Sequence, residues 1–198
     1  MSRLLGLVVF GATLVAPAAA AQNLRGFARL GGDFGGDPVL QFEYSDGSTP
    51  DVEAGRGLIV AAGGSLRLFR AAGQGLDLVA SVGLKFTTIP PATNQDATWL
   101  RFPVEGLLLY RMPFGLSIGG GTTVHLANTM KASGAVSNAE LKFKTAPGFI
   151  VHAEYGKARW AVDLRYTVME YEIESGGSGT VNANAIGGGF TFFLGGGR

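Results

Sequence analysis

Residues 140–155 read ELKFKTAPGFIVHAEY, a stretch in which apolar and polar side chains alternate. Most odd positions are apolar, namely Leu141, Phe143, Pro147, Phe149, Val151, Ala153 and Tyr155. The polar side chains fall largely on even positions, namely Glu140, Lys142, Lys144, His152 and Glu154. A period of two is typical of a β-strand, because successive side chains point to opposite faces, whereas a helix would mix the two sets. The stretch predicts a strand with one apolar and one polar face.

The same period recurs along the chain. Residues 160–173 place Trp160 and Val162 on one face and Asp163 and Arg165 on the other, with a phase slip near Met169 that predicts a β-bulge. Weaker alternation elsewhere brings the expected number of strands to about eight. The predicted strands are 40–44, with a start as early as Phe27, then 58–68, 76–86, 100–110, 114–126, 141–155, 160–173 and 186–194.

The composition limits the class of protein. The chain has 198 residues, 46% hydrophobic and 16% charged, with 32 glycines, which favours one all-β domain over a helical bundle. A net charge of +1 gives no basic field for nucleic acid, and the absence of cysteine excludes disulfides and thiolate metal sites. No segment approaches the roughly 20 uninterrupted apolar residues that a transmembrane helix needs. A membrane role would therefore require a closed β-barrel.

Residues 1–21 have the organisation of a secretory signal peptide. Arg3 supplies the positive start, residues 4–15 the short apolar core, and the four alanines at 18–21 the small-residue cleavage site. We expect the mature protein to begin at Ala21 or Gln22, and residues 22–198 to form one β-barrel domain.

The predicted connections alternate in length. Residues 71–75, 112–113 and 156–157 form tight turns, whereas the stretches rich in Gly, Ser, Thr, Asn and Pro are long, namely 45–55, 88–96, 128–138 and 174–181. Transmembrane β-barrels have short periplasmic turns and long extracellular loops. The pattern thus predicts a closed, antiparallel, up-and-down transmembrane barrel with both ends of the chain on the periplasmic side.

Two features indicate that the polar face lines the lumen and the apolar face contacts lipid. The polar face carries many small residues and charges of both signs, which suit a narrow interior. We predict a structural polar network in the lumen made of Arg29, Asp33, Arg67, Asp77, Lys85, Arg101, Glu105, His125, Lys142, Lys144, His152, Glu154, Arg159, Asp163 and Arg165. The apolar face carries aromatic side chains beside the short turns, which predicts an interfacial aromatic girdle of Tyr110, Phe114, Tyr155, Trp160 and Phe192.

Two segments, LRFPVEGLLLY at 100–110 and GGGFTFF at 187–193, show the closest local likeness to a known class. The whole mature region resembles the small bacterial outer-membrane β-barrel proteins, which include opacity-type surface proteins. This resemblance implies a location in the bacterial outer membrane, contact with its lipid and lipopolysaccharide, and insertion by the outer-membrane assembly machinery; we expect a monomer. The chain departs from that class at its end, because Leu194 to Arg198 follow Phe193 where members of the class end on an aromatic residue.

The sequence offers little enzyme chemistry. Lipid A deacylases, which are also outer-membrane barrels, carry a serine two residues after a histidine, whereas here Ala127 follows His125. We therefore expect no catalytic residues, and a lipid A-modifying hydrolase is the least favoured alternative. His125, His152 and Glu154 fall on the lumen face, where a metal cluster is geometrically possible, but we interpret them as members of the polar network and expect no metal or cofactor.

Two functions remain open. The barrel has a structural or surface-interaction role through its long loops, with a partner that the sequence does not identify, or it is a narrow pore or carrier for small apolar molecules. We favour the first because many inward charges of both signs, Asp163 and Arg165 among them, would interlock and plug a barrel of eight strands.

Overall fold

The computed structural model describes residues 23–41, 51–89, 96–133, 139–157 and 159–194, and the chain in these ranges is almost entirely β-strand. The predicted signal peptide, the residues Phe42 and Tyr44 of the first predicted strand, and the C-terminal residues 195–198 lie outside these ranges. Among the described residues, no helix is long and apolar enough to cross a membrane.

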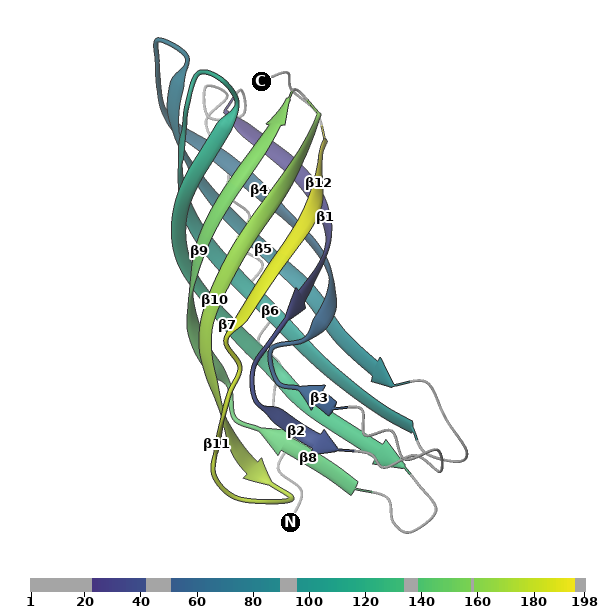
Figure 1. Ribbon diagram of the computed structural model, residues 1–198. Coiled ribbons are helices and arrows are strands. Elements are labelled where there is room, and N and C mark those ends of the chain that lie inside the picture. The colour runs from purple at the N-terminus through teal and green to yellow at the C-terminus, as the bar shows by residue number, and fades with distance from the viewer. Residues whose placement is uncertain (1–22, 42–50, 90–95, 134–138, 158, 195–198) are drawn as a thin grey trace, which may run out of the picture.

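Eight strands form a closed antiparallel ring, as Figure 1 shows. In chain order they are β1 (Leu24–Phe34), β4 (Gly57–Ala71), β5 (Gln74–Ile89), β6 (Asp96–Arg111), β7 (Leu116–Ser133), β9 (Ala146–Lys157), β10 (Trp160–Ser175) and β12 (Ala185–Leu194). Each pairs with the next in this order, and β12 pairs with β1 from Phe34↔Ile186 to Gly26↔Leu194, which closes the ring. The predicted all-β, up-and-down, eight-stranded barrel is confirmed.

Four short strands extend the structure at the end with the long connections. They are β2 (Pro38–Gln41), β3 (Asp51–Glu53), β8 (Ala139–Phe143) and β11 (Thr180–Asn182). β2 and β3 form a separate hairpin, β8 continues the sheet beside β7 and β10, and β11 pairs with β10. We call this end, beyond the apolar belt defined below, the crown.

The first strand of the ring was placed wrongly by the sequence. Leu40 belongs to β2, which lies outside the ring, whereas the ring begins with β1 at Leu24. Phe27 does belong to β1, but its side chain is buried inside the barrel, while Leu30 and Phe34 face outward. The spacing of four positions from Leu30 to Phe34 keeps these two side chains on one face, whereas the spacing of three from Phe27 to Leu30 places Phe27 on the other face.

The two faces of the barrel wall differ in polarity, and β10 shows this most clearly. From Trp160 to Val168 the even positions are exposed and apolar, whereas Asp163, Arg165 and Thr167 are buried. These nine residues match the roughly 9–11 that a tilted strand needs to cross a bilayer. Exposed large apolar side chains occupy corresponding positions on the other ring strands, so together they form an apolar belt around the outside.

No bulge occurs at Met169, so that prediction is wrong. Exposed and buried positions continue to alternate through Tyr171 and Glu172, and a register shift appears only between Ile173 and Ser175. The polarity of the faces reverses instead: Glu170 and Glu172 point outward, and Met169 and Tyr171 point inward. The cause is the environment, because the strand leaves the apolar belt after Val168 and its outer face meets water.

A β-bulge does interrupt β7, at a place that the alternation did not indicate. Leu126 pairs with Phe102 and Thr129 with Leu100, so β7 has one residue more than β6 between these pairs. Ala127 takes up the extra residue with a positive φ of 46°. The extra residue shifts which positions of β7 face inward. Before the bulge the inward residue is His125, at an odd position, and after it the inward residues are Asn128 and Met130, at even positions.

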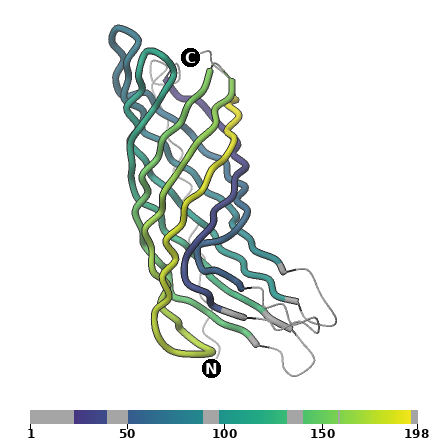
Figure 2. Tube along the Cα trace, in the orientation of Figure 1, coloured from purple at the N-terminus to yellow at the C-terminus, as the bar shows by residue number. Residues whose placement is uncertain are grey.

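The short turns all lie at one end of the barrel. The connections β4–β5, β6–β7 and β9–β10 are short and reach the end where β12 finishes, at the top of Figures 1 and 2. At the opposite end β5, β6, β7 and β8 continue beyond the ring as a projecting sheet. In transmembrane barrels the short turns are periplasmic, which orients this barrel with the crown outside the cell.

The apolar belt generates a stability prediction. Replacing Leu164, which is exposed in the middle of the belt, with Arg will lower the free energy of unfolding by roughly 2–4 kcal/mol, because a charge would face hydrocarbon. The measurement is reversible denaturant unfolding in lipid vesicles, with folding verified by heat-modifiable gel migration. Glu170→Arg, on the same face of β10 but in the crown, serves as the control and will change stability little. Equal losses for both variants would contradict the position of the belt.

Candidate functional site

The interior of the barrel is held together by buried ion pairs. Arg29 of β1 donates from Nη2 to Asp163 Oδ1 at 2.6 Å and from Nε to Asp163 Oδ2 at 3.0 Å. This bidentate pair spans β12, which lies between β1 and β10 in the ring. A Cβ atom at Gly189 would lie 2.7 Å from Arg29 Nη2 and 2.9 Å from Asp163 Oδ2. Glycine at position 189 therefore provides the space that the pair occupies.

A second ion pair crosses the lumen. Arg165 of β10 donates to both carboxylate oxygens of Glu105 of β6, at 2.5 and 3.3 Å, and Ser81 donates to Glu105 at 3.4 Å. Asp163 and Arg165 are two apart on one strand and both point inward, and each binds a partner on another strand, Arg29 for Asp163 and Glu105 for Arg165.

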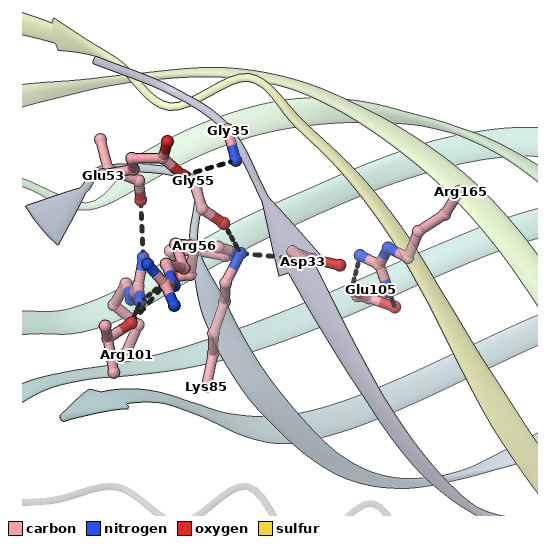
Figure 3. A network of polar contacts seen from close by, with 12 residues as sticks. Asp33, Gly35, Glu53, Gly55, Arg56, Lys85, Arg101, Glu105 and Arg165 are labelled. Carbon is pink, nitrogen blue, oxygen red and sulfur yellow. Dashed lines mark hydrogen bonds and ion pairs between the residues drawn. The ribbon is translucent and has the colours of Figure 1, made fainter. Parts of the chain in front are cut away.

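Towards the crown, two cations bind the backbone of the β3–β4 connection, which turns into the mouth of the barrel (Figure 3). Lys85 Nζ donates to Asp33 Oδ2 at 2.7 Å and to the carbonyl of Gly55 at 2.6 Å. Arg101 donates to the carbonyl of Ala54 at 2.7 Å and to that of Arg56 at 2.5 Å. Since these carbonyls are the hydrogen-bond acceptors of two buried cations, the hydrogen bonds hold the β3–β4 connection in the mouth of the barrel.

Above this layer the interior is apolar. The crown encloses a cluster of inward side chains in which Trp99 stacks on Phe143 with ring centroids 5.0 Å apart, and Tyr171 packs against both. Two hydrogen bonds tie its edge to neighbouring polar residues. Trp99 Nε1 donates to Asn128 Oδ1 at 2.5 Å, and the Tyr171 hydroxyl lies 2.6 Å from His125 Nδ1. We call this cluster the apolar cap.

The periplasmic half of the lumen combines a charged cluster with aromatic packing. Asp77 accepts from Arg67 Nε at 2.7 Å and from Arg111 Nη2 at 2.6 Å. Phe27 and Phe193 meet edge to face with centroids 6.2 Å apart. The open volume among these groups is about 30 Å³, on the scale of ordered water rather than of a solute.

Three residues predicted for the lumen lie elsewhere, so the prediction is wrong for them. Lys142 and Lys144 point outward from the crown, where they pair with Glu140 and Glu172. The predicted strand 141–155 is two strands, β8 and β9, and the phase changes between Phe143 and Ala146, which are both buried. Arg159 is exposed in the β9–β10 turn.

The other predicted lumen residues lie inside, and their positions follow from the period of two. They are Arg29, Asp33, Arg67, Asp77, Lys85, Arg101, Glu105, His125, His152, Glu154, Asp163 and Arg165. The prediction missed Arg111, which is buried and binds Asp77. Its odd position on β6, in phase with Arg101 and Glu105, was the signal that could have identified it. The apolar cap was also missed, because in the crown the apolar side chains point inward, whereas the prediction assigned every apolar face to the outside.

The two histidines do not form a cluster. His152 pairs in register with Gly119, and His125 lies six positions further along β7 (125 − 119), which is about 20 Å at the rise of a strand. No group of three His, Asp or Glu side chains suited to a metal ion occurs among the described residues.

The aromatic residues proposed for the girdle share one location. Tyr110, Phe114, Tyr155, Trp160 and Phe192 are all exposed on the outside near the short turns. Trp160 pairs in register with Phe192, and Tyr110 donates from its hydroxyl to Gln74 Oε1 at 2.7 Å. Aromatic side chains with a polar edge are favoured at the boundary between hydrocarbon and headgroups.

A closed ring of eight antiparallel strands with an apolar outside, a paired ionic interior and short turns at one end defines an outer-membrane β-barrel. Among solved structures, that of Neisserial surface protein A aligns with a TM-score of 0.50 at 10% identity, covering 86% of this chain and 96% of that one. The structure of Ail, the attachment invasion locus protein of Yersinia pestis, aligns with a TM-score of 0.48 at 13% identity, covering 85% and 97%. No protein-family model and no curated protein sequence matches the chain.

The ion pair between Arg165 and Glu105 generates the next prediction. Arg165→Ala will cost about 3–5 kcal/mol of unfolding free energy, because it leaves the Glu105 carboxylate buried without its partner. The double variant Arg165→Met/Glu105→Leu will recover most of this loss, since no unpaired charge remains. Denaturant unfolding of both variants in the same vesicles provides the measurement. A double variant that is no more stable than Arg165→Ala would show that burial of an unpaired charge is not the cause.

Proposed function

We propose that this protein is a non-conducting outer-membrane barrel whose crown makes contacts at the cell surface. The observation that carries the proposal is the filling of the interior: ion pairs cross the lumen, and the apolar cap closes the crown end. The belt contacts the lipid and lipopolysaccharide of the membrane, and the barrel acts as a monomer inserted by the outer-membrane assembly machinery.

Closure of the lumen is supported at three heights. The Arg67–Asp77–Arg111 cluster lies at the periplasmic end, the Arg165–Glu105 pair near the middle, and the apolar cap at the other end. A water path would have to cross all three layers. This favours a plugged barrel over a pore or a carrier for small apolar molecules.

The crown has the features of a contact surface. It raises paired strands beyond the belt, and the outer face of β10 there carries Glu170, Glu172 and Glu174, all exposed. Lys144 neutralises Glu172, whereas the exposed carboxylates of Glu170 and Glu174 remain on the surface. A basic partner surface fits this edge by charge complementarity.

The residue that would act as the nucleophile of a lipid A deacylase, two positions after the histidine, is not a serine here. Ala127 occupies that position, and its exposed methyl group lies at the bulge of β7. His125 on the same strand points inward and contacts Tyr171. We therefore propose a non-enzymatic role.

Closure of the lumen predicts the electrical behaviour of the protein. The folded barrel, inserted into a planar bilayer, will show no stable conductance steps, because no continuous water path crosses the three layers. Insertion is verified on the same preparation by heat-modifiable migration and protease protection. Reproducible steps on the nanosiemens scale would refute the plug and favour a pore.

The acidic edge predicts a charge-dependent contact. Bacteria that display the barrel will adhere to a surface coated with a cationic peptide, and Glu170→Gln/Glu174→Gln will lower this adherence because two exposed negative charges are lost. Flow-cell counting of retained cells measures the effect. Lys142→Gln/Lys144→Gln, on the same crown, is the control of opposite sign and will raise adherence. If both variants leave adherence unchanged, this edge of the crown is not the contact surface.

A further inference from the structure

The periplasmic end of the barrel carries a hollow of about 410 Å³ between the three short turns. Four cationic side chains line it, namely Arg67, Arg70, Arg111 and Lys157. They come from β4, β6 and β9, which the closed ring brings to the same end. We call this group of four residues the basic rim.

Asp77 alone does not neutralise the basic rim. Asp77 accepts hydrogen bonds from both Arg67 and Arg111, so one carboxylate serves two guanidinium groups. Among the described residues, no ion pair involves Arg70 or Lys157, and Arg111 Nη1 has no hydrogen-bond partner although it is buried. The four cations of the basic rim and the one carboxylate of Asp77 together carry a formal charge of +3.

The opposite end of the barrel differs in this respect. On the outside of the crown three lysines, Lys131, Lys142 and Lys144, lie among the carboxylates Glu140, Glu170, Glu172 and Glu174. Lys142 pairs with Glu140 and Lys144 with Glu172. Two of these crown lysines are thus held by carboxylates, unlike Arg70 and Lys157 of the basic rim, and this difference favours an anionic ligand at the periplasmic end.

The height of the basic rim indicates where that ligand comes from. Phe114 lines the hollow and is 65% exposed on the outside, and it belongs to the aromatic girdle. Tyr110 of the girdle donates to Gln74, which also lines the hollow. Aromatic girdles lie at the level of the lipid headgroups, so the basic rim lies at the level of the headgroup phosphates of the periplasmic leaflet.

We propose that the basic rim binds the phosphate of an anionic phospholipid of the periplasmic leaflet, with the acyl chains running along the outside beside Phe114. Guanidinium groups match phosphate oxygens in geometry and charge, and Lys157 adds a mobile ammonium group. The inference depends on the orientation of the barrel in the membrane. It is independent of what the crown contacts, so the two proposals succeed or fail separately.

The test uses the full mature chain folded in nanodiscs of phosphatidylcholine with a minority of phosphatidylglycerol. Native mass spectrometry measures the ratio of the two lipids that remain bound when the protein is released. Arg70→Gln/Lys157→Gln changes two exposed side chains and leaves the Asp77 cluster intact. It will lower the retained ratio of phosphatidylglycerol to phosphatidylcholine about tenfold, since each basic residue near a membrane surface strengthens the binding of anionic lipid severalfold.

Lys142→Gln/Lys144→Gln removes the same charge from the crown and will leave that ratio unchanged. Heat-modifiable migration verifies that both variants fold. Equal decreases in the two variants, or no enrichment of phosphatidylglycerol by the unmodified chain, would overturn the proposal. A second experiment adds inorganic phosphate at millimolar concentration: retention of the lipid supports a lipid site, whereas complete displacement would assign the basic rim to a soluble anion and overturn the lipid site.

Discussion

Every backbone N–H and C=O within the membrane must find a partner in the protein, because hydrocarbon offers none. The ladder between β1 and β12 meets this requirement, since it pairs the first and last strands and leaves the ring without an open edge. Closure with eight strands then fixes a narrow interior. The side chains that point inward have to fill that interior and pair with one another, so the ion pairs, the glycines beside them and the aromatic packing all follow from closure.

The interior shows how charge is accommodated at low exposure. Arg29 and Asp163 are 6% and 0% exposed, and the two side chains bind each other in bidentate geometry. A buried pair of this kind adds little net stability, but the loss of one partner is costly. The Arg29–Asp163 pair therefore fixes how β1, β12 and β10 lie relative to one another, and Gly189 on the middle strand leaves room for it.

The sequence predicted most of the fold and the inward side chains, and the failures have physical causes. From Trp160 to Val168 the environment is constant, lipid outside and lumen inside, so alternation reports orientation directly. Beyond Val168 the outer face meets water, so polar side chains point outward and apolar ones inward. In the sequence this reversal looks the same as the extra residue of a bulge, which is why a bulge was predicted. The true bulge at Ala127 has no such signal. The partners of Arg29 and Arg165 depend on which strands adjoin in the closed ring, and Arg29 and Asp163 are 134 positions apart in the chain.

Because of the reversal of polarity, the inner side of the crown provides its packing and the outer side provides its polar surface. Trp99, Tyr171 and Phe143 hold its strands together from within, whereas outward residues such as Glu170 contribute little to that packing. Substitutions on the outer side are therefore nearly free of thermodynamic penalty. Such a surface can therefore change its charge and shape while the packing that holds the crown and the barrel together stays the same.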